Sequence, residues 1–396
     1  MCSLSNGEKM SNRDDLLQML QGQEPERIPY IYMGFHDERA MHKLVPADCC
    51  DENTYYVPCD DPPRERFSPE PRTHESRERA VRMSEYLDMA TVAVGKGAVS
   101  HFGHGGPGEI QPVVIERTET HKILQYEGGH KRYFHYNPHS IRYYDFPIKD
   151  EQDLENLELP DMRDPARFKD IEEDCRFVKE SGFVPVASVQ GFFSGIHNSF
   201  MDYADTLANL LLKPQFMHRI TETLARMSLD AAEMLLDRGV ETITVCDDLG
   251  NAGGLIISPQ TFREFFLPWY EELTRLAHDR GAYIHLHSHG NIKKVLPDLV
   301  SIGIDIIDPF DWDENPDLPA LVKQYGRDVI FCGGSTGDIY EKDLDEVEYI
   351  IKRACSLADI AEKGYILMTY GGLDTLSNEY WSSCLEIMSQ ARERRS

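Results

Sequence analysis

Three histidines alternate along one short apolar segment, residues 282–290 (AYIHLHSHG). In an extended chain, side chains two residues apart share a face and are separated by about 6.6 Å along the strand. The segment therefore predicts a strand that carries His285, His287 and His289 on one face. The isoleucine and leucine between them face the other way, and the glycine after the third histidine opens the strand into a loop.

Alternate histidines at the end of a strand suit metal binding, because neutral imidazole is a good ligand for zinc and similar divalent ions. The same side chains also suit acid–base catalysis or anion binding near neutral pH, and we predict a catalytic role for His285. The alternative without chemistry is a set of polar side chains that hydrogen-bond inside the fold. Three histidines on one face favour function over that alternative.

Acidic residues follow a second apolar run. Asp247 and Asp248 come directly after residues 242–246 and are predicted to be catalytic. Paired acids at the end of a buried strand are costly unless water, hydrogen bonds or a ligand stabilise them. Either acid could be a metal ligand, a general base or a substrate acceptor; the alternative is a loop acid that caps backbone amides. Asp308 and Cys332 stand at two further strand ends, where Cys332 is expected as a small core residue.

Further residues at strand ends are candidates for substrate binding. Gln190 and Phe192 follow one apolar run, Gly333 and Gly334 end another, and Tyr370 ends the last. Glycines let a backbone approach a ligand, and a nest of N–H groups can hold an anion. For these glycines the alternative is tight packing of the chain against itself.

The elements that would position these residues alternate between strand and helix from about residue 150 onward. Apolar runs that predict strands lie at residues 184–189, 242–246, 282–287, 304–307, 329–332 and 365–369, with an earlier candidate at 90–94. Helical stretches with caps separate them, which predicts a parallel sheet with helices outside it. We therefore expect a TIM-type (β/α)8 barrel with its active site at the carboxyl ends of the strands. A doubly wound open sheet is the second choice, although no G-x-G-x-x-G follows any of these strands.

The rest of the chain is organised around that barrel. Residues 1–80 are expected to form an N-terminal arm with a short helix near residues 13–22, and residues 81–396 the barrel. Within the barrel domain, residues 110–148 change to short β-branched and aromatic runs with a turn at Gly128–Gly129. This pattern predicts an antiparallel β meander inserted into the main domain.

Composition limits the partners and the compartment. The net charge of −27 repels phosphate backbones and anionic lipid, which argues against nucleic-acid and membrane partners. Nine cysteines without a framework spacing fit reduced thiols. The first residues lack the apolar core of a signal peptide, and no apolar run approaches the ~20 residues of a membrane span. We therefore expect a cytoplasmic protein.

Several short phrases, in their order and spacing, resemble the uroporphyrinogen decarboxylase superfamily. They are residues 22–29 (GQEPERIP), 146–148 (FPI), 247–248 (DD), 257–268 (ISPQTFREFFLP), 287–290 (HSHG), 303–305 (GID) and 333–334 (GG). The resemblance covers nearly the whole chain and implies a barrel that often forms homodimers. It also implies one of two activities: decarboxylation of porphyrins, or zinc-dependent transfer of methyl groups between corrinoid proteins and thiols.

The resemblance carries particular residues with it. The methyltransferases bind zinc through a His-x-Cys-Gly phrase and a distant cysteine; here the phrase reads His287-Ser-His289-Gly, and the distant position, near Tyr370, has no cysteine. This implies a nitrogen and oxygen site formed by His287 and His289, with Asp247 or Asp248 as third ligand. The arginine-rich stretch by which the decarboxylases bind substrate carboxylates is missing from residues 30–39 (YIYMGFHDER).

We therefore expect a methyltransferase-like enzyme that acts on a small molecule. Its expected cofactors are zinc or another divalent metal, held by His287 and His289, and a corrinoid methyl donor on a partner protein. The second possibility is a metal-independent decarboxylase of a porphyrinogen or related ring, in which Asp248 or a neighbouring acid stabilises charge. The third is a barrel that binds without catalysis.

Overall fold

Eight parallel strands form the central sheet of the computed structural model, which describes residues 12–35, 38–49, 73–94, 113–138 and 140–393. In spatial order they are β1 (Tyr30–Tyr32), β14 (Tyr365–Thr369), β13 (Ile330–Gly334), β12 (Ile306–Phe310), β11 (Tyr283–His287), β8 (Thr242–Cys246), β7 (Val184–Gln190) and β2 (Thr91–Ala93). The two edges approach each other, since the amide of Ala90 donates to the carbonyl of Tyr30 at 2.9 Å. The sheet is thus a nearly closed barrel, which confirms the predicted (β/α)8 fold over the open sheet.

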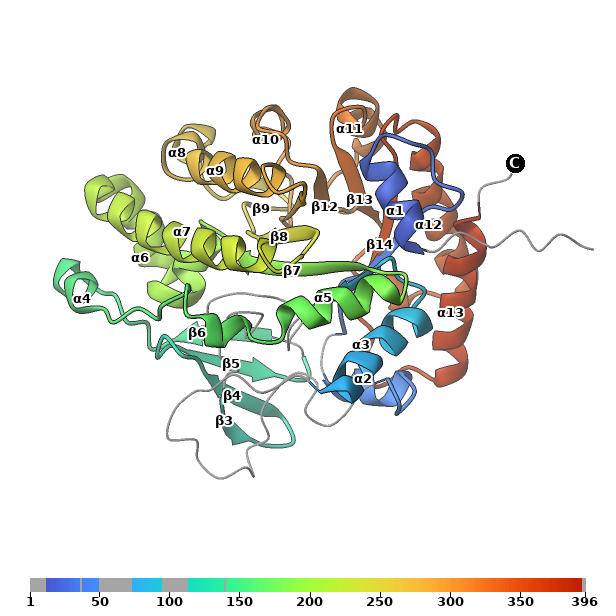
Figure 1. The fold of residues 1–396 in the computed structure, drawn as a ribbon, viewed down its shortest axis with the longest axis horizontal. Coiled ribbons are helices and arrows are strands. Elements are labelled where there is room, and N and C mark those ends of the chain that lie inside the picture. Colours follow the sequence, from blue (N-terminus) through green and yellow to red (C-terminus); the bar gives the residue numbers. More distant parts are fainter. Residues whose placement is uncertain (1–11, 36–37, 50–72, 95–112, 139, 394–396) are drawn as a thin grey trace, which may run out of the picture.

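Helices surround the strands (Figure 1) and bury their apolar faces against the outside of the barrel. They are α2 (Glu38–Leu44), α3 (His74–Tyr86), α4 (Glu151–Asn156), α5 (Ile171–Glu180), α6 (Tyr203–Leu212), α7 (Pro214–Leu236), α8 (Pro259–Phe265), α9 (Leu267–His278), α10 (Leu296–Ser301), α11 (Leu318–Tyr325), α12 (Leu344–Cys355) and α13 (Asn378–Ala391). Short 3-10 helices lie at Pro165–Phe168, Ile339–Glu341 and Ser356–Asp359, and a π-helix lies at Ile196–Phe200. None of the helices in the described ranges is long and apolar enough to cross a membrane.

The inside of the barrel has its own apolar core. Val184, Ile306, Ile330 and Ile366 point inward from four strands and pack against one another. Helix α1 (Asn12–Leu20) contributes Leu16, Met19 and Leu20 to the same cluster. Because α1 packs beneath the strands and β1 is a barrel strand, both belong to the barrel core, although both lie within the residues that the sequence assigned to an arm.

The predicted antiparallel insertion is present between β2 and β7. It is a four-stranded meander with the spatial order β3 (Val113–Arg117), β4 (His121–Gln125), β5 (Lys131–His135) and β6 (Ser140–Tyr144). Gly129 has φ +89° in the turn between β4 and β5, a conformation that favours glycine. A two-stranded ribbon of β9 (Gly250–Asn251) and β10 (Gly254–Leu255) follows the carboxyl end of β8. Residues 110–112 and 139 of the predicted insertion lie outside the described residues.

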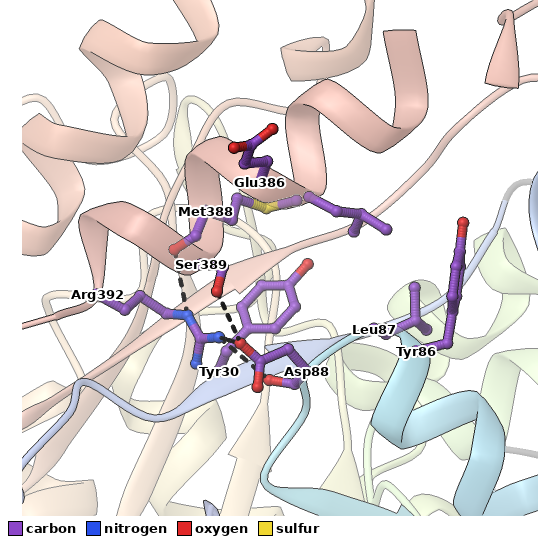
Figure 2. A pocket seen from close by; sticks show the side chains of 9 residues that line it. Tyr30, Tyr86, Leu87, Asp88, Glu386, Met388, Ser389 and Arg392 are labelled. Atoms are coloured by element: carbon purple, nitrogen blue, oxygen red, sulfur yellow. Dashed lines mark hydrogen bonds and ion pairs between the residues drawn. The ribbon is translucent and has the colours of Figure 1, made fainter. Parts of the chain in front are cut away.

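An ionic cluster ties the elements together at the amino-terminal ends of β1 and β2. Figure 2 shows Asp88 beside Arg392 and Ser389, at a cavity of about 330 Å³ that Tyr30 also lines. Arg27 adds two hydrogen bonds to the same carboxylate, of 3.1 and 2.6 Å. This cluster joins β1, β2 and α13 at the base of the barrel, the end at which barrel residues usually serve stability rather than catalysis.

Candidate functional site

The alternating histidine strand is β11, and it lies in the middle of the sheet between β8 and β12. Ile284 and Leu286 are fully buried in the outer core, between the strands and the helices. His285 and His287 point the other way, into the barrel. His285 is buried and His287 lies one layer closer to the mouth. The pleat of one strand therefore delivers both imidazoles to the same interior.

Asp308 on β12 connects the two imidazoles. Its Oδ1 lies 3.2 Å from Nε2 of His285 and 3.1 Å from Nδ1 of His287. The strand register explains this closeness, because Asp308 is paired directly with His287 across the parallel ladder. A buried carboxylate thus lies between two histidines that occupy successive layers of the barrel interior.

The charges in this layer shift the pKa values of Asp308 and His287. Burial by itself would raise the pKa of Asp308, but His285 and His287 hold it well below its usual range. For His287, burial by itself would lower the pKa, but the charges of Asp308, Asp248 and Glu314 outweigh burial and raise the pKa to about 9. Without a bound metal, His287 is therefore an imidazolium at neutral pH.

The mouth above this layer is formed by His289 and two carboxylates. The rings of His287 and His289 lie 5.0 Å apart at 85°, so they face each other edge to face. Nε2 of His287 is 3.8 Å from Oδ1 of Asp248, and Nδ1 of His289 is 3.8 Å from Oε1 of Glu314. Backbone amides hold both acids in place: the His289 amide donates to Asp248 at 3.0 Å and the Gly290 amide to Glu314 at 2.8 Å.

The two neighbouring acids that end β8 have different surroundings. Asp247 is fully buried, and its oxygens accept hydrogen bonds from the amides of Phe193 and Ser194 and from the hydroxyl of Tyr270. Asp248 points to the mouth, with a side chain that is 51% exposed. The contacts of Asp247 match the alternative of a loop acid that caps backbone amides, whereas Asp248 keeps a side chain that can reach a ligand at the mouth.

Tyr370 lies at the mouth as well. Its ring centroid is 5.6 Å from that of His289, and its hydroxyl donates to Oδ2 of Asp311 at 3.0 Å. Burial raises the pKa of Asp311 to about 7, and the hydrogen bond from Tyr370 and the charge of His289 oppose that rise. Oδ1 of Asp311 has no hydrogen-bond partner in the structure.

Two of the other predicted substrate-binding residues lie on or after β7. Gln190 is buried, donates from Nε2 to the hydroxyl of Ser199 at 3.3 Å, and leaves Oε1 without a partner. Phe192 is fully buried in the outer core, where its ring meets that of Tyr270 at 4.9 Å. Gln190 thus keeps a free acceptor, whereas the contacts of Phe192 are those of a packing residue.

The glycines that end β13 are required by packing. A Cβ at Gly333 would lie 2.6 Å from the backbone nitrogen of Phe310, and one at Gly334 would lie 2.2 Å from the hydroxyl of Tyr365. Their φ angles, +141° and +80°, also favour glycine. Tight packing therefore explains both positions, and nothing in their surroundings shows contact with a substrate.

Reasoning from the sequence missed His197, which the fold brings toward the mouth. It lies on the π-helix Ile196–Phe200, with its ring 5.2 Å from that of Phe193 and 4.9 Å from that of Tyr203. Burial lowers its pKa to about 4, although the charge of Asp248 acts in the opposite direction. A single histidine has no periodic pattern, so no sequence signal could have found it; short π-helical segments, however, occur frequently at functional sites.

Donor atoms for a metal gather in two layers. At the mouth are the imidazoles of His287 and His289 with their facing carboxylates. In the layer below, donor atoms of His285, Asp308 and Cys332 all lie within 4.8 Å of one another. All three residues of the lower layer are buried, and burial raises the pKa of the Cys332 thiol well above its ordinary value.

Comparison with known proteins identifies the family. The family model of uroporphyrinogen decarboxylase (URO-D) matches residues 133–374, more than half of the chain. The chain belongs to the uroporphyrinogen decarboxylase family. This confirms the resemblance seen in the sequence, and the matched range contains every strand of the barrel from β7 onward together with the residues of the mouth.

Individual members of this enzyme family are only distantly similar to the chain. A uroporphyrinogen decarboxylase from Alkalilimnicola ehrlichii is 25% identical over 186 residues, which are 43% of this chain and 48% of that protein. The match thus spans about half of that relative's length. A methyltransferase from Methanosarcina mazei has a similar structure, with a TM-score of 0.66, 12% identity, and coverage of 96% of this chain and 99% of that one. At this identity the structural similarity shows the fold alone.

Proposed function

We propose that this member of the uroporphyrinogen decarboxylase family is a metal-dependent methyltransferase that works at the mouth of its barrel. In this proposal His287 and His289 hold a divalent metal, zinc being the first choice. A corrinoid on a partner protein supplies the methyl group, and a small molecule accepts it. This choice is supported by the fold shared with the Methanosarcina mazei methyltransferase and by the phrase His287-Ser-His289-Gly, which stands where the methyltransferases have His-x-Cys-Gly.

The observation that carries the proposal is the contact between Asp308 and His287. Nδ1 of His287 lies 3.1 Å from Oδ1 of Asp308, so the carboxylate accepts the Nδ1 proton. This leaves Nε2 as the nitrogen that faces the mouth, toward Asp248. Histidines that bind metals almost always donate their second N–H to a carboxylate or carbonyl in this way, which fixes the tautomer and the orientation of the ring.

Pairs of donors at the mouth come close to the spacing of metal ligands, although no three of the described donors there lie within 4.8 Å of one another. Metal–nitrogen and metal–oxygen bonds of about 2.0–2.1 Å place two ligands of a tetrahedral ion roughly 3.3 Å apart. The two histidine–carboxylate distances at the mouth are both 3.8 Å. Asp248 is half exposed and has room to move by the remaining half ångström. His287 and His289 would hold the metal, with Asp248 or Glu314 as a further ligand once the side chains move together, and the bound metal would supply a Lewis acid for the sulfur or oxygen of the acceptor.

The charge at the mouth favours methyl transfer over decarboxylation of a porphyrinogen. The ion pairs of His285, His287 and His289 in the structure are all with carboxylates: Asp248, Asp308 and Glu314. A porphyrinogen carries several carboxylates, which such a mouth would repel. A neutral or thiol-bearing acceptor meets no such penalty.

One observation favours decarboxylation as the second candidate. His287, with a pKa raised to about 9, is protonated at neutral pH when no metal is present. A positioned imidazolium could protonate the carbanion that loss of carbon dioxide leaves, because general acids transfer protons to developing charge in this way. Under this alternative the protein would need no metal.

The compartment and the assembly also belong to the proposal. Five of the described cysteines, Cys175, Cys246, Cys332, Cys355 and Cys384, are free thiols, as expected in a reducing cytoplasm. We keep the homodimer suggested by the family resemblance as part of the same proposal.

Elemental analysis and one transfer assay test the proposal. Purified wild-type protein should contain stoichiometric metal, and His289→Ala should lose about one equivalent of it. His218→Ala, which removes an exposed histidine from α7, is the matched control and should keep all of it. With methylcobalamin as donor and a simple thiol as acceptor, the wild type should transfer methyl groups and His289→Ala should not. Decarboxylation of a porphyrinogen by metal-free protein would overturn the proposal in favour of the second candidate.

A further inference from the structure

A second group of metal-binding side chains lies one layer below the mouth. It consists of His285 on β11, Asp308 on β12 and Cys332 on β13, which are neighbouring strands. Their exposed fractions are 6%, 3% and 0%. One donor atom from each lies within 4.8 Å of the other two. No other group of three such donors occurs in the described ranges of the chain, so this convergence is a specific property of the barrel interior.

The three side chains lie in apolar surroundings, where polar groups are unfavourable unless something compensates for the lost water. Ile306, Ile330, Ile366 and Met368 pack in the same inner cluster as Cys332. A carboxylate and an imidazole buried among aliphatic side chains cost several kcal/mol unless charge pairing or coordination compensates for the lost water. A metal ion is one of the few ligands that can satisfy a carboxylate, an imidazole and a thiol together.

Hydrogen bonding within the protein leaves the group incomplete. Nε2 of His285 is buried and lies 3.2 Å from Oδ1 of Asp308, close enough for a hydrogen bond but without the geometry of one. A simple ion pair would explain the approach of these two side chains. It would explain neither the missing hydrogen bond nor the thiol of Cys332 at the same point. Buried polar atoms without a partner are rare, and each needs a specific explanation.

We propose that His285, Asp308 and Cys332 bind a second metal ion, a thiophilic divalent ion such as Zn²⁺, inside the barrel. The 3.2 Å between Nε2 and Oδ1 is close to the roughly 3.3 Å that separates nitrogen and oxygen ligands on a tetrahedral zinc ion. The donor set also selects the ion, because thiolate and imidazole favour zinc over magnesium and calcium. Three protein ligands leave one tetrahedral position for water.

Asp308 links this inner site to the mouth. The same Oδ1 that faces His285 also lies 3.1 Å from Nδ1 of His287. An ion bound to Asp308 would hold that carboxylate, and through it the ring of His287, in one orientation. The inner site would therefore position the mouth, as residues behind metal ligands usually do. Its existence does not depend on the function proposed for the mouth.

Cobalt substitution tests the inner site directly. Full-length protein freed of metal with a chelator and loaded with Co²⁺ should show the near-ultraviolet charge-transfer absorption of a thiolate–cobalt bond. Cys332→Ser should lose that absorption and one equivalent of Co²⁺. Cys384→Ser is the matched control, because Cys384 is equally buried but lies on α13, away from these donors. The control should keep both. His285→Gln should lose the same equivalent, and circular dichroism should show that each variant is folded.

The outcomes separate this inference from the function proposed for the mouth. A thiolate–cobalt absorption that persists in Cys332→Ser, or full-length protein that binds no Co²⁺, would overturn the inner site. His289→Ala should keep the absorption while losing a separate equivalent of metal. If His289→Ala loses none and Cys332→Ser still loses one, the mouth metal is wrong and the inner site stands.

Discussion

Two ionic clusters at opposite ends of the barrel share one plan, in which a carboxylate stands between two basic side chains. At the base Asp88 contacts Arg27 and Arg392. Below the mouth Asp308 contacts His285 and His287. In both clusters the basic partners outweigh burial and lower the pKa of the aspartate. The two carboxylates thus play the same electrostatic part, and the clusters differ in the chemistry of their basic side chains.

The partners at the base have permanent charges and many hydrogen bonds. Arg27 makes two hydrogen bonds to Asp88, and Arg392 donates to the backbone carbonyls of Ile28 and Met388 as well as to the carboxylate. A guanidinium cannot lose its proton in a protein. The partners of Asp308 are imidazoles, which can release a proton and then bind a metal. The arginine cluster at the base is therefore suited to holding the two edges of the barrel together. The imidazole cluster below the mouth is suited to exchanging protons for a metal ion.

The same aspartate-to-asparagine change can be made in both clusters. Asp308→Asn should have the larger effect of the two, and its effect should be on function. It removes the charge that orients His287 and one ligand of the inner site. We expect the affinity for metal at both proposed sites to fall by about 100-fold, or about 2.7 kcal/mol. The rate of methyl transfer should fall by a similar factor. The melting temperature should change little, because the imidazoles can release a proton when the counter-charge disappears. Competition with a chelating dye measures the affinity, and unchanged affinity would contradict the role given to Asp308.

Asp88→Asn should show the reverse pattern. The left-handed backbone at this position, with φ +56°, accepts asparagine, so only the charge changes. Arg392 would lose its carboxylate partner, and Arg27 would keep only its ion pair with Glu393. We expect a loss of about 2 kcal/mol of stability, allowing for the partial exposure of Asp88, and a fall of about 2 °C in melting temperature for a chain of this length. Metal content should stay at the wild-type level; equal thermal losses in the two variants would break the comparison.

The sequence predicts the barrel and the histidines well because both rest on local periodicity. Alternating strand and helix patterns specify the parallel sheet, and a spacing of two places His285 and His287 on one face. The partner of these histidines was not assigned, because Asp308 lies on the next strand and only the register brings the carboxylate to them. Cys332 was expected as a small core residue for the same reason. Its neighbours, not its own strand, make it a candidate ligand.

Other parts of the site depend on the direction of single side chains. Asp247 and Asp248 are adjacent, but one turns to backbone amides and the other to the mouth, a difference that sequence spacing does not show. Glu314 reaches His289 from the loop after β12. The cluster at the base is still harder to foresee, since Arg392 and Asp88 are 304 residues apart. Contacts of this kind form only when the barrel closes, and no local pattern in the sequence predicts them.

The smallest expected effect is the loss of stability at acid pH that comes from Asp88. It tests directly whether the two arginines at the base depend on the charge of this carboxylate. In the folded protein the pKa of Asp88 is lowered to about 2, whereas an unfolded aspartate has a pKa of about 3.9. The unfolded state therefore binds more protons between these values. The stabilisation from Asp88, of the order of 1–2 kcal/mol, is complete above about pH 5 and is lost as the pH falls toward about 2.

The melting temperatures of the wild type and Asp88→Asn should therefore differ by a constant amount above about pH 5 and converge as the solution becomes more acid. The other paired carboxylates, Asp308 among them, are present in both proteins, so the difference isolates Asp88. Burial lowers the pKa of His197 to about 4 and that of His130 to about 3, so both titrate in this window, but both are present in the two proteins and cancel from the difference. A difference that stays constant down to pH 3 would mean that the two arginines do not depend on the charge of Asp88, and the contrast between permanent and exchangeable partners would then fail at the base.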